Sequence, residues 1–152
     1  MPAFSTTRRV PHTAANMFDL VADAEKYPRF LPLCEALKIR GRQDLGEGRE
    51  ILVADMTVAF KVVRETYTSR VVLDRPAMVI QVAYLDGPFE HLDNRWTFRD
   101  LDGGACEVDF AIDYRFKNRT LGALMGAMFD KAFHKFSEAF AKRADEVYGR
   151  GA

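Results

Sequence analysis

The feature that most constrains the fold is a change of hydrophobic period near residue 118, in the last third of the chain. From Ala105 to Lys117 apolar and polar residues alternate, which is the pattern of a half-buried antiparallel strand. From Thr120 to Tyr148 the apolar residues recur three and four positions apart, which predicts one amphipathic helix. At 1.5 Å per residue this helix would be about 44 Å long, close to the diameter of a small domain. A sheet that grips such a helix has room between them for an apolar ligand.

Turn-forming residues divide the rest of the chain into shorter elements. We expect a first strand at Phe4–Val10, a short helix from Thr13 to Val21 with Thr13 as its N-cap, and a second helical piece at Ala24–Phe30. Further strands are expected at Ala36–Arg42, Glu50–Val58, Phe60–Leu73, Ala77–Leu85, Leu92–Leu101 and Ala105–Lys117. Glycine, proline and aspartate mark the breaks, except for a weak break at Val58–Phe60. This order predicts an α+β fold: a curved antiparallel sheet of about seven strands around the C-terminal helix, with two short helices after the first strand.

Composition is that of one ordinary globular domain over residues 1–152, with 48% hydrophobic and 29% charged residues. The 22 basic and 22 acidic residues cancel, so no overall field directs the chain to nucleic acid or to a membrane. From Arg115 onward basic residues outnumber acidic ones, which gives the long helix a mildly basic outer face. That face is either simply solvated or a surface for a partner.

Cysteine use and hydropathy indicate the compartment. Cys34 and Cys106 both lie in apolar contexts, which argues against a disulfide framework and for a reducing environment. No apolar run approaches the roughly 18 residues of a membrane span, and the first residues alternate like a strand rather than forming a signal-peptide core. We therefore expect a cytoplasmic protein, at most peripheral to the inner membrane.

Short motifs in the same order along nearly the whole chain carry a family resemblance. They are Tyr27-Pro28-Arg29-Phe30-Leu31-Pro32-Leu33-Cys34, Asp86-Gly87-Pro88-Phe89, Leu92, Trp96-Thr97-Phe98, Phe116-Lys117-Asn118, Ala139–Ala144 and Val147-Tyr148. Together they resemble the coenzyme Q-binding protein family of the START-like, polyketide cyclase-like superfamily, which also includes the bacterial ribosome-association toxin A proteins. The resemblance implies the START-like helix-grip fold, with a lipid-binding cavity between the sheet and its C-terminal helix.

Aromatic and sulfur-containing side chains are the candidate ligand contacts. The predicted cavity lining is Phe30, Leu31, Trp96, Phe98, Phe110, Ile112, Tyr114, Met125, Met128, Phe129 and Phe133. Trp96 and Phe98 share one strand face, either as core residues or as flat walls for a quinone ring, and the Trp96 N–H could donate to a carbonyl oxygen. The helical Met and Phe residues are either core or a site that adapts to an irregular ligand. The proline-flanked segment Tyr27–Cys34 either docks the short helices or gates the cavity.

Two glycines near the start of the long helix, Gly122 and Gly126, suggest a lid. Each weakens a helix by about 1 kcal/mol relative to alanine. Close backbone approach, flexibility or space for a ligand tail could each compensate. We expect flexibility of the first half of the helix.

Signals for catalysis and for metal binding are weak. His12, His91 and His134 are far apart and lack metal-ligand spacing, and there is no phosphate-binding loop or nucleophile motif. Some START-like proteins are cyclases or dehydratases that use a buried acid–base pair, for which Asp55, Glu65 or Arg70 are the candidates. Because strand charges usually face water, we expect no catalytic residues, no metal, no catalytic cofactor and no enzyme activity.

Three functions remain open. The first is a carrier or chaperone that holds ubiquinone or a related isoprenoid lipid and so supports respiratory electron transport. A domain with a radius of gyration of about 15 Å cannot enclose a long tail, which implies transient membrane contact or a covering partner. The second is binding of the large ribosomal subunit, which would block subunit association and should require a concentrated basic patch. The third is a cyclase-like or dehydratase-like enzyme. We expect a monomer, because polar residues protect the edge strand Phe4–Val10.

Overall fold

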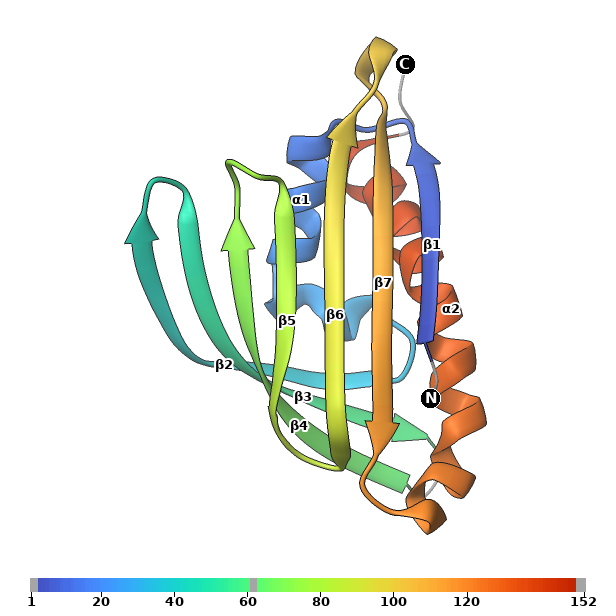
Figure 1. Ribbon diagram of the computed structural model, residues 1–152. Coiled ribbons are helices and arrows are strands. Elements are labelled where there is room, and N and C mark those ends of the chain that lie inside the picture. Colours follow the sequence, from blue (N-terminus) through green and yellow to red (C-terminus); the bar gives the residue numbers. More distant parts are fainter. Residues whose placement is uncertain (1–2, 61–62, 150–152) are drawn as a thin grey trace.

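Seven antiparallel strands form one strongly curved sheet, and helices cover its concave face (Figure 1). The computed structural model describes residues 3–60 and 63–149. Its elements are β1 (Ala3–Val10), α1 (Ala14–Ala22), the 3-10 helix η1 (Ala24–Arg29), β2 (Cys34–Gly46), β3 (Arg49–Phe60), β4 (Val63–Asp74), β5 (Val79–Asp86), β6 (Phe89–Asp100), the 3-10 turn η2 (Asp102–Gly104), β7 (Cys106–Phe116) and α2 (Arg119–Tyr148). The strand order is β1-β7-β6-β5-β4-β3-β2, so β1 and β2 are the edges. The predicted fold, including the two short helices after β1, is confirmed.

Several strand boundaries differ from the prediction, most clearly those of the β3–β4 hairpin, of β2, and of β6, which begins at Phe89 rather than Leu92. The break expected at Val58–Phe60 is wrong, because β3 continues to Phe60 and pairs with β4 as far as Phe60 opposite Val63. The two residues between them lie outside the described part of the chain. β2 is longer than Ala36–Arg42 and has three register shifts against β3. Each shift inserts a residue that disturbs the alternation of side chains, so the sequence pattern of this strand is weak.

The long helix buries one apolar stripe against the sheet. Its buried residues recur at helical spacing: Met125, Phe129, Ala132, Phe133, Phe136, Phe140 and Ala144. On the sheet side the rings of Tyr114 and Phe133 lie 5.0 Å apart, and those of Trp96 and Phe140 lie 4.9 Å apart. Full burial of each large apolar side chain stabilises the fold by about 1.5–3 kcal/mol.

The two ends of α2 are held differently. Near its C-terminus, His12 Nε2 lies 2.8 Å from Asp145 Oδ1, and the Tyr148 hydroxyl donates to the Asn16 carbonyl at 3.1 Å. These contacts tie the helix end to α1 and to the loop before it, where Thr13 caps α1 as predicted. Near the N-terminus of α2, Leu124 is 67% exposed. The first turns of α2 are therefore the less covered part of the helix.

Candidate ligand-binding cavity

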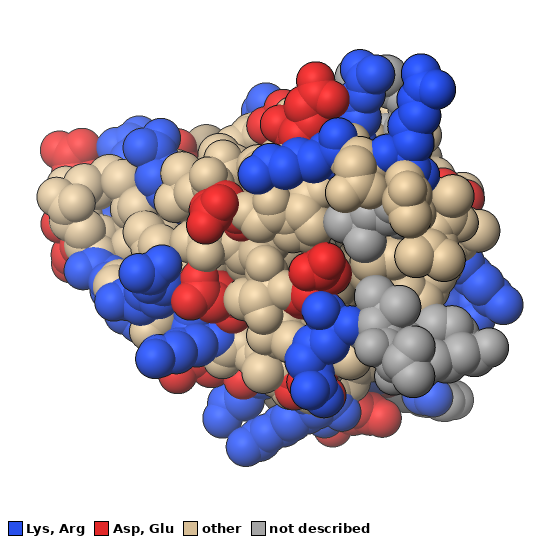
Figure 2. All heavy atoms as spheres, turned by 90° about the horizontal axis from the view of Figure 1, so that it is seen from below, with Lys and Arg blue, Asp and Glu red and all other residues tan. Residues whose placement is uncertain are grey.

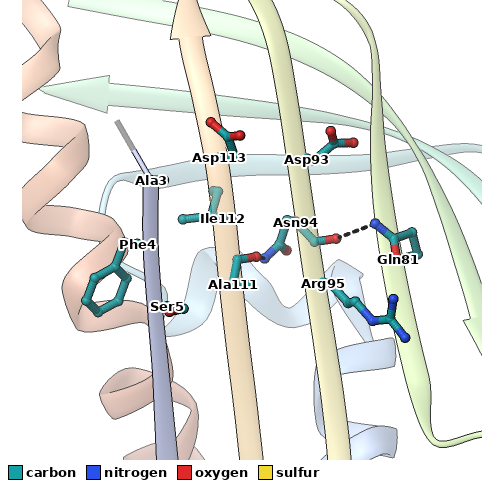
Figure 3. A pocket seen from close by; sticks show the side chains of 10 residues that line it. All are labelled: Ala3, Phe4, Ser5, Gln81, Asp93, Asn94, Arg95, Ala111, Ile112 and Asp113. Atoms are coloured by element: carbon teal, nitrogen blue, oxygen red, sulfur yellow. Dashed lines mark hydrogen bonds between the residues drawn. The ribbon is translucent and has the colours of Figure 1, made fainter. Parts of the chain in front are cut away.

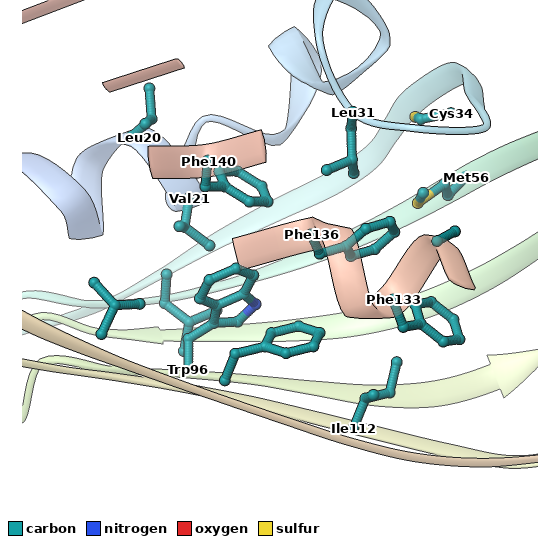
Figure 4. Close-up of a cluster of buried hydrophobic side chains, with 14 of the residues drawn as sticks. Leu20, Val21, Leu31, Cys34, Met56, Trp96, Ile112, Phe133, Phe136 and Phe140 are labelled. Carbon is teal, nitrogen blue, oxygen red and sulfur yellow. The ribbon is translucent and has the colours of Figure 1, made fainter. Parts of the chain in front are cut away.

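An apolar cavity of about 80 Å³ lies between the concave face of the sheet, the α1–η1 segment and the second half of α2. Its lining is Val21, Ala22, Ala24, Tyr27, Leu31, Leu37, Leu52, Ala54, Met56, Tyr67, Ser69, Val71, Ile80, Val82, Asn94, Trp96, Phe136 and Phe140. Figure 4 shows Trp96 rising from the sheet toward Phe136 and Phe140 of α2, with Val21 and Leu31 beside them.

Aromatic contacts hold one wall of the cavity in place. The Trp96 ring packs edge-on against Phe110 at 4.7 Å and against Phe140 at 4.9 Å. Phe140 in turn contacts Tyr27 at 5.3 Å and Phe30 at 5.1 Å. The proline-flanked segment therefore meets α2 through aromatic edges, and gating of the cavity by this segment stays a prediction.

Every lining residue in the described part of the chain is uncharged, and the polar groups are few. Trp96 Nε1 donates to Asn94 Oδ1 at 3.0 Å, and Asn94 Nδ2 donates to the Ala111 carbonyl at 2.8 Å. The Tyr27 hydroxyl donates to the Val21 carbonyl, and the Tyr67 hydroxyl donates to Met56 Sδ at 3.3 Å. The indole N–H, which could donate to a ligand carbonyl, is thus already bonded within the protein.

Burial keeps the cavity electrically neutral. It raises the pKa of Tyr27 and of Tyr67 far above the ordinary value for a phenol, with a smaller contribution from Cys34. Burial also raises the pKa of the Cys34 thiol to about 11. These groups remain protonated at neutral pH, because desolvation disfavours their charged forms.

Two of the three acid–base candidates, Asp55 and Arg70, face away from the cavity. Ala54 and Met56 line it, and side chains alternate along a strand, so Asp55 between them points to the other face. There Asp55 accepts a hydrogen bond from Thr68 Oγ1 at 2.5 Å and lies 3.8 Å from Arg40. Arg70 alternates in the same way with Ser69 and Val71, which line the cavity from β4. Glu65 lies on the same face of β4 as Tyr67 and Ser69, but it is outside the lining. The structure brings none of the three to the cavity.

Of the predicted ligand contacts, Leu31 and Trp96 line this cavity. Phe30 lies beside it against Phe140. The others lie outside the lining. Phe98, on β6, packs against Phe18 of α1, with the ring centroids 5.8 Å apart. The rest lie where β7 and α2 pack directly together: Phe110, Ile112, Tyr114, Met125, Met128, Phe129 and Phe133. The rings of Phe116 and Phe129 illustrate this packing, stacked 5.3 Å apart. A ligand contact at these residues stays a prediction.

Half of the lining residues that the sequence analysis missed lie on β3, β4 and β5. Large apolar side chains surround two small ones there, and these two, Ala54 and Ser69, are direct partners in the β3–β4 ladder. A facing pair of small residues on the concave side of a curved sheet leaves space that neighbouring side chains do not fill. Small residues at strand positions that face the concave side of the sheet, rather than aromatic residues, were therefore the sequence signal for the cavity.

The helix glycines do not serve close packing. A Cβ at Gly126 would meet no atom within 4 Å, and one at Gly122 would meet only Phe116, at 3.8 Å. Both line a surface groove between the end of β7 and the start of α2. Close backbone approach therefore does not explain the two glycines. Flexibility of the helix and open space for a ligand tail remain as explanations.

A second depression lies on the convex face of the sheet, across β1, β7, β6 and β5 (Figure 3). It is open to solvent and carries charges of both signs, Asp93, Arg95 and Asp113, beside Gln81, whose amide donates to the Asn94 carbonyl at 3.5 Å. Hydrated charges on an open strand surface make it a weaker ligand site than the apolar cavity.

Within residues 3–60 and 63–149, His, Cys, Asp and Glu side chains form no group of three or more that could hold a metal ion. In the same residues no helix is long and apolar enough to cross a membrane.

Comparison with known proteins identifies relatives along the whole chain. The ribosome association toxin RatA of Rickettsia prowazekii is 33% identical over 97% of this chain and 99% of its own length. The coenzyme Q-binding protein COQ10 homolog B, mitochondrial, of Xenopus laevis is 28% identical over 97% of this chain and 59% of its own length.

Solved structures agree on the fold. The 18 kDa protein CC1736 from Caulobacter crescentus superposes with a TM-score of 0.78 at 33% identity, over 98% of this chain and 99% of the other. A START superfamily protein from Mycobacterium smegmatis superposes with a TM-score of 0.77 at 18% identity, over 95% of this chain and 98% of the other. Residues 10–141 match the family described as polyketide cyclase / dehydrase and lipid transport. With its START-like helix-grip fold, the chain belongs to this polyketide cyclase / dehydrase and lipid transport family.

Proposed function

We propose that the protein binds a neutral, largely apolar small molecule in the cavity, with ubiquinone or a related isoprenoid lipid as the ligand. The observation that carries this proposal is the uncharged lining. An unpaired carboxylate or ammonium group is costly to bury, so a fatty acid or a lipid phosphate would find no counter-ion there. A quinone with a prenyl tail has no charge to neutralise. The resemblance to the coenzyme Q-binding protein of Xenopus laevis supports the same ligand class.

The size of the cavity requires it to widen when a ligand enters. Its volume of about 80 Å³ is about half the roughly 150 Å³ of an engineered apolar cavity that holds benzene. A substituted quinone ring needs more space than benzene. The rings of Phe136 and Phe140, on the helix side, are the groups whose displacement would enlarge it. Burial at about 0.8 kcal/mol per CH₂ makes one or two prenyl units enough to offset such a rearrangement.

In this account the protein carries its ligand and performs no reaction on it. Of the acid–base candidates, Asp55 and Arg70 lie on the other face of the sheet from the cavity. Glu65 shares the face of Tyr67 and Ser69 but lies outside the lining. The lining groups that carry protons are phenols and a hydroxyl, held neutral by burial or uncharged by nature. A carrier role in respiratory electron transport follows for a quinone ligand.

A long prenyl tail would extend beyond the domain, and we propose that transient membrane contact or a partner covers it. Leu124 is 67% exposed near the start of α2, and Leu85 is 53% exposed near the end of β5. Both elements reach the same end of the molecule (Figure 1). This end is the one we expect to approach the membrane while the protein otherwise stays in the cytoplasm as a monomer.

Intrinsic fluorescence tests the interior site directly, because Trp96 is the one tryptophan of the chain and lines the cavity. Titration with ubiquinone bearing one or two prenyl units should quench it saturably. Val82→Phe, which adds a ring to the lining, should weaken the quenching, whereas Val147→Phe at a residue 49% exposed should not. N-acetyltryptophanamide corrects for absorption by the quinone. Equal, non-saturating quenching of all three proteins would refute an interior site.

Ribosome association is the second candidate function, favoured by the relatives that carry that name. The exposed outer face of α2 carries Lys131, Lys135 and Lys142, but Asp130, Glu138 and Glu146 are interspersed with them. Figure 2 likewise shows basic and acidic side chains side by side on the lower end of the molecule. Co-sedimentation with purified large ribosomal subunits at low salt, lost steeply as salt rises, would support this function. Absence of co-sedimentation at low salt would exclude it.

A further inference from the structure

One polar group of the cavity is left without a partner. Ser69, on β4, is 5% exposed, and its hydroxyl oxygen is buried without a hydrogen bond to any described protein atom. Ser69 also lines the cavity. A buried hydroxyl without a partner destabilises a folded protein, and such groups are rare enough in native structures to need an explanation.

The backbone around Ser69 is shaped to present this hydroxyl. Its partner across the β3–β4 ladder is Ala54, whose small side chain leaves the hydroxyl uncovered. On its other side the β4–β5 register shifts between Thr68 and Ser69, where Thr68 pairs with Asp86 and Ser69 with Tyr84. Such irregularities re-aim side chains and are frequent beside binding sites.

The other polar groups of the lining already have partners. The Trp96 N–H and one Asn94 N–H are bonded within the protein, as is the Tyr27 hydroxyl. The Tyr67 hydroxyl donates only to a methionine sulfur, which is a weak acceptor. Among the described lining residues, Ser69 thus offers a buried hydroxyl that a ligand oxygen could engage without breaking a hydrogen bond in the protein.

We propose that the Ser69 hydroxyl donates a hydrogen bond to an oxygen atom of the ligand, so that the cavity selects neutral lipids that carry a carbonyl or ether oxygen on their apolar body. This inference rests on the proposed function and deepens it: the uncharged walls exclude ionised ligands, and Ser69 discriminates among neutral ones. It also orients the ligand, because the oxygen-bearing ring lies at β4 and the tail leads away from it.

A matched pair of small probes tests the proposal with the intact protein. Duroquinone carries two carbonyl oxygens on a tetramethylated ring, and durene is the tetramethylated ring without them. Duroquinone binding is followed by quenching of Trp96, and durene binding by displacement of duroquinone. Ser69→Ala should weaken duroquinone binding about 3- to 10-fold, the range of one neutral hydrogen bond. It should leave durene binding unchanged.

Ser137→Ala is the control, since Ser137 is also buried, at 3% exposure, but lies on α2 outside the lining. It should change neither affinity. Ser69→Cys keeps the size of the side chain and a weak donor, so its affinity for duroquinone should fall between those of the wild type and Ser69→Ala. It replaces Ser69→Ala in the test if that variant does not fold.

Failure of the Ser69 inference and failure of the proposed function would give different results. If Ser69→Ala weakens the binding of duroquinone and of durene equally, Ser69 acts through shape alone and the inference is overturned. Unchanged binding of both probes would also overturn it. If the wild-type protein binds neither duroquinone nor a short-chain ubiquinone, the proposed function itself fails and this inference with it.

Discussion

At the scale of single residues, the same few side chains support both the core and the cavity. Trp96 joins three elements, because its ring contacts Phe110 on β7 and Phe140 on α2, and its N–H is bonded to Asn94 on its own strand. Ser69 and Tyr114 have the opposite character, since each has a buried hydroxyl without a partner in the described protein. Tyr114 is buried between β7 and α2 rather than in the cavity.

Replacement of Trp96 by alanine should destabilise the protein by about 3–5 kcal/mol, the usual cost of deleting a large buried aromatic side chain. Urea unfolding followed by circular dichroism measures this free energy. Tyr148→Ala, at a residue 39% exposed, is the control, and its free energy of unfolding should fall much less. A loss of less than about 1 kcal/mol at Trp96 would contradict the packing described.

Removal of either unpartnered hydroxyl should raise stability. Ser69→Ala and Tyr114→Phe each delete a polar group whose burial is uncompensated, so each should raise the free energy of unfolding by about 1 kcal/mol. Urea unfolding of the ligand-free protein gives both values. Destabilisation by either change would mean that the hydroxyl makes a hydrogen bond in solution.

At the scale of elements, α2 combines an anchored half with a less covered half. Its C-terminal half is tied to the segment after β1 through His12–Asp145 and Tyr148, and it forms one wall of the cavity. Its first turns contain Gly122 and Gly126 beside a surface groove. The lid expected from these glycines would thus be a movement of the start of the helix relative to a fixed end.

Gly126→Ala should stabilise the helix by up to about 1 kcal/mol, because the added methyl group meets no atom within 4 Å. If the start of α2 is a lid, the same change should slow the uptake of short-chain ubiquinone, measured by stopped-flow quenching of Trp96. Ala127→Gly, at the exposed neighbouring position, is the reverse change and should have the opposite effects. A stabilised helix with an unchanged uptake rate would rule out the lid.

The elements themselves could be predicted from the sequence, whereas most of the cavity lining, apart from Leu31 and Trp96, could not. Strict alternation in β7 and helical spacing in α2 are local patterns, and turn residues mark most strand ends. The cavity depends instead on pairing between strands: Ala54 and Ser69 become neighbours only through the β3–β4 register. Aromatic residues such as Phe129 and Phe133 drew the prediction toward the first half of α2, but their rings fill the space there by stacking, with centroids 5.7 Å apart.

At the scale of the whole molecule, one continuous core buries several groups that release a proton at alkaline pH. Burial raises the pKa of Tyr114 to about 12, from an ordinary value of 10.0, and the pKa of Cys34 and of Cys106 to about 11, from 9.0. Tyr27 and Tyr67 shift further in the same direction. In each case the folded state holds its proton more tightly than the unfolded state.

Stability should therefore be unaffected by these groups below about pH 9 and should fall as the pH rises from 9 to 12. In that range the unfolded chain loses protons that the folded chain keeps, which favours unfolding. The urea concentration at the midpoint of unfolding, measured across this pH range, shows how steeply stability falls with pH. Tyr114→Phe removes one contributor and should flatten the fall between pH 10 and 12. A constant midpoint up to pH 12 would contradict the burial of these groups.

The most direct test of the account is native mass spectrometry, with lipid extraction, on the protein purified without detergent from a quinone-producing host. We expect a neutral isoprenoid lipid, ubiquinone in the first place, to co-purify with the protein in a one-to-one ratio. The Val82→Phe variant should lose this lipid, whereas the Val147→Phe variant should retain it. An empty wild-type protein that also takes up no short-chain ubiquinone on incubation would contradict the central claim and leave ribosome association as the function to pursue.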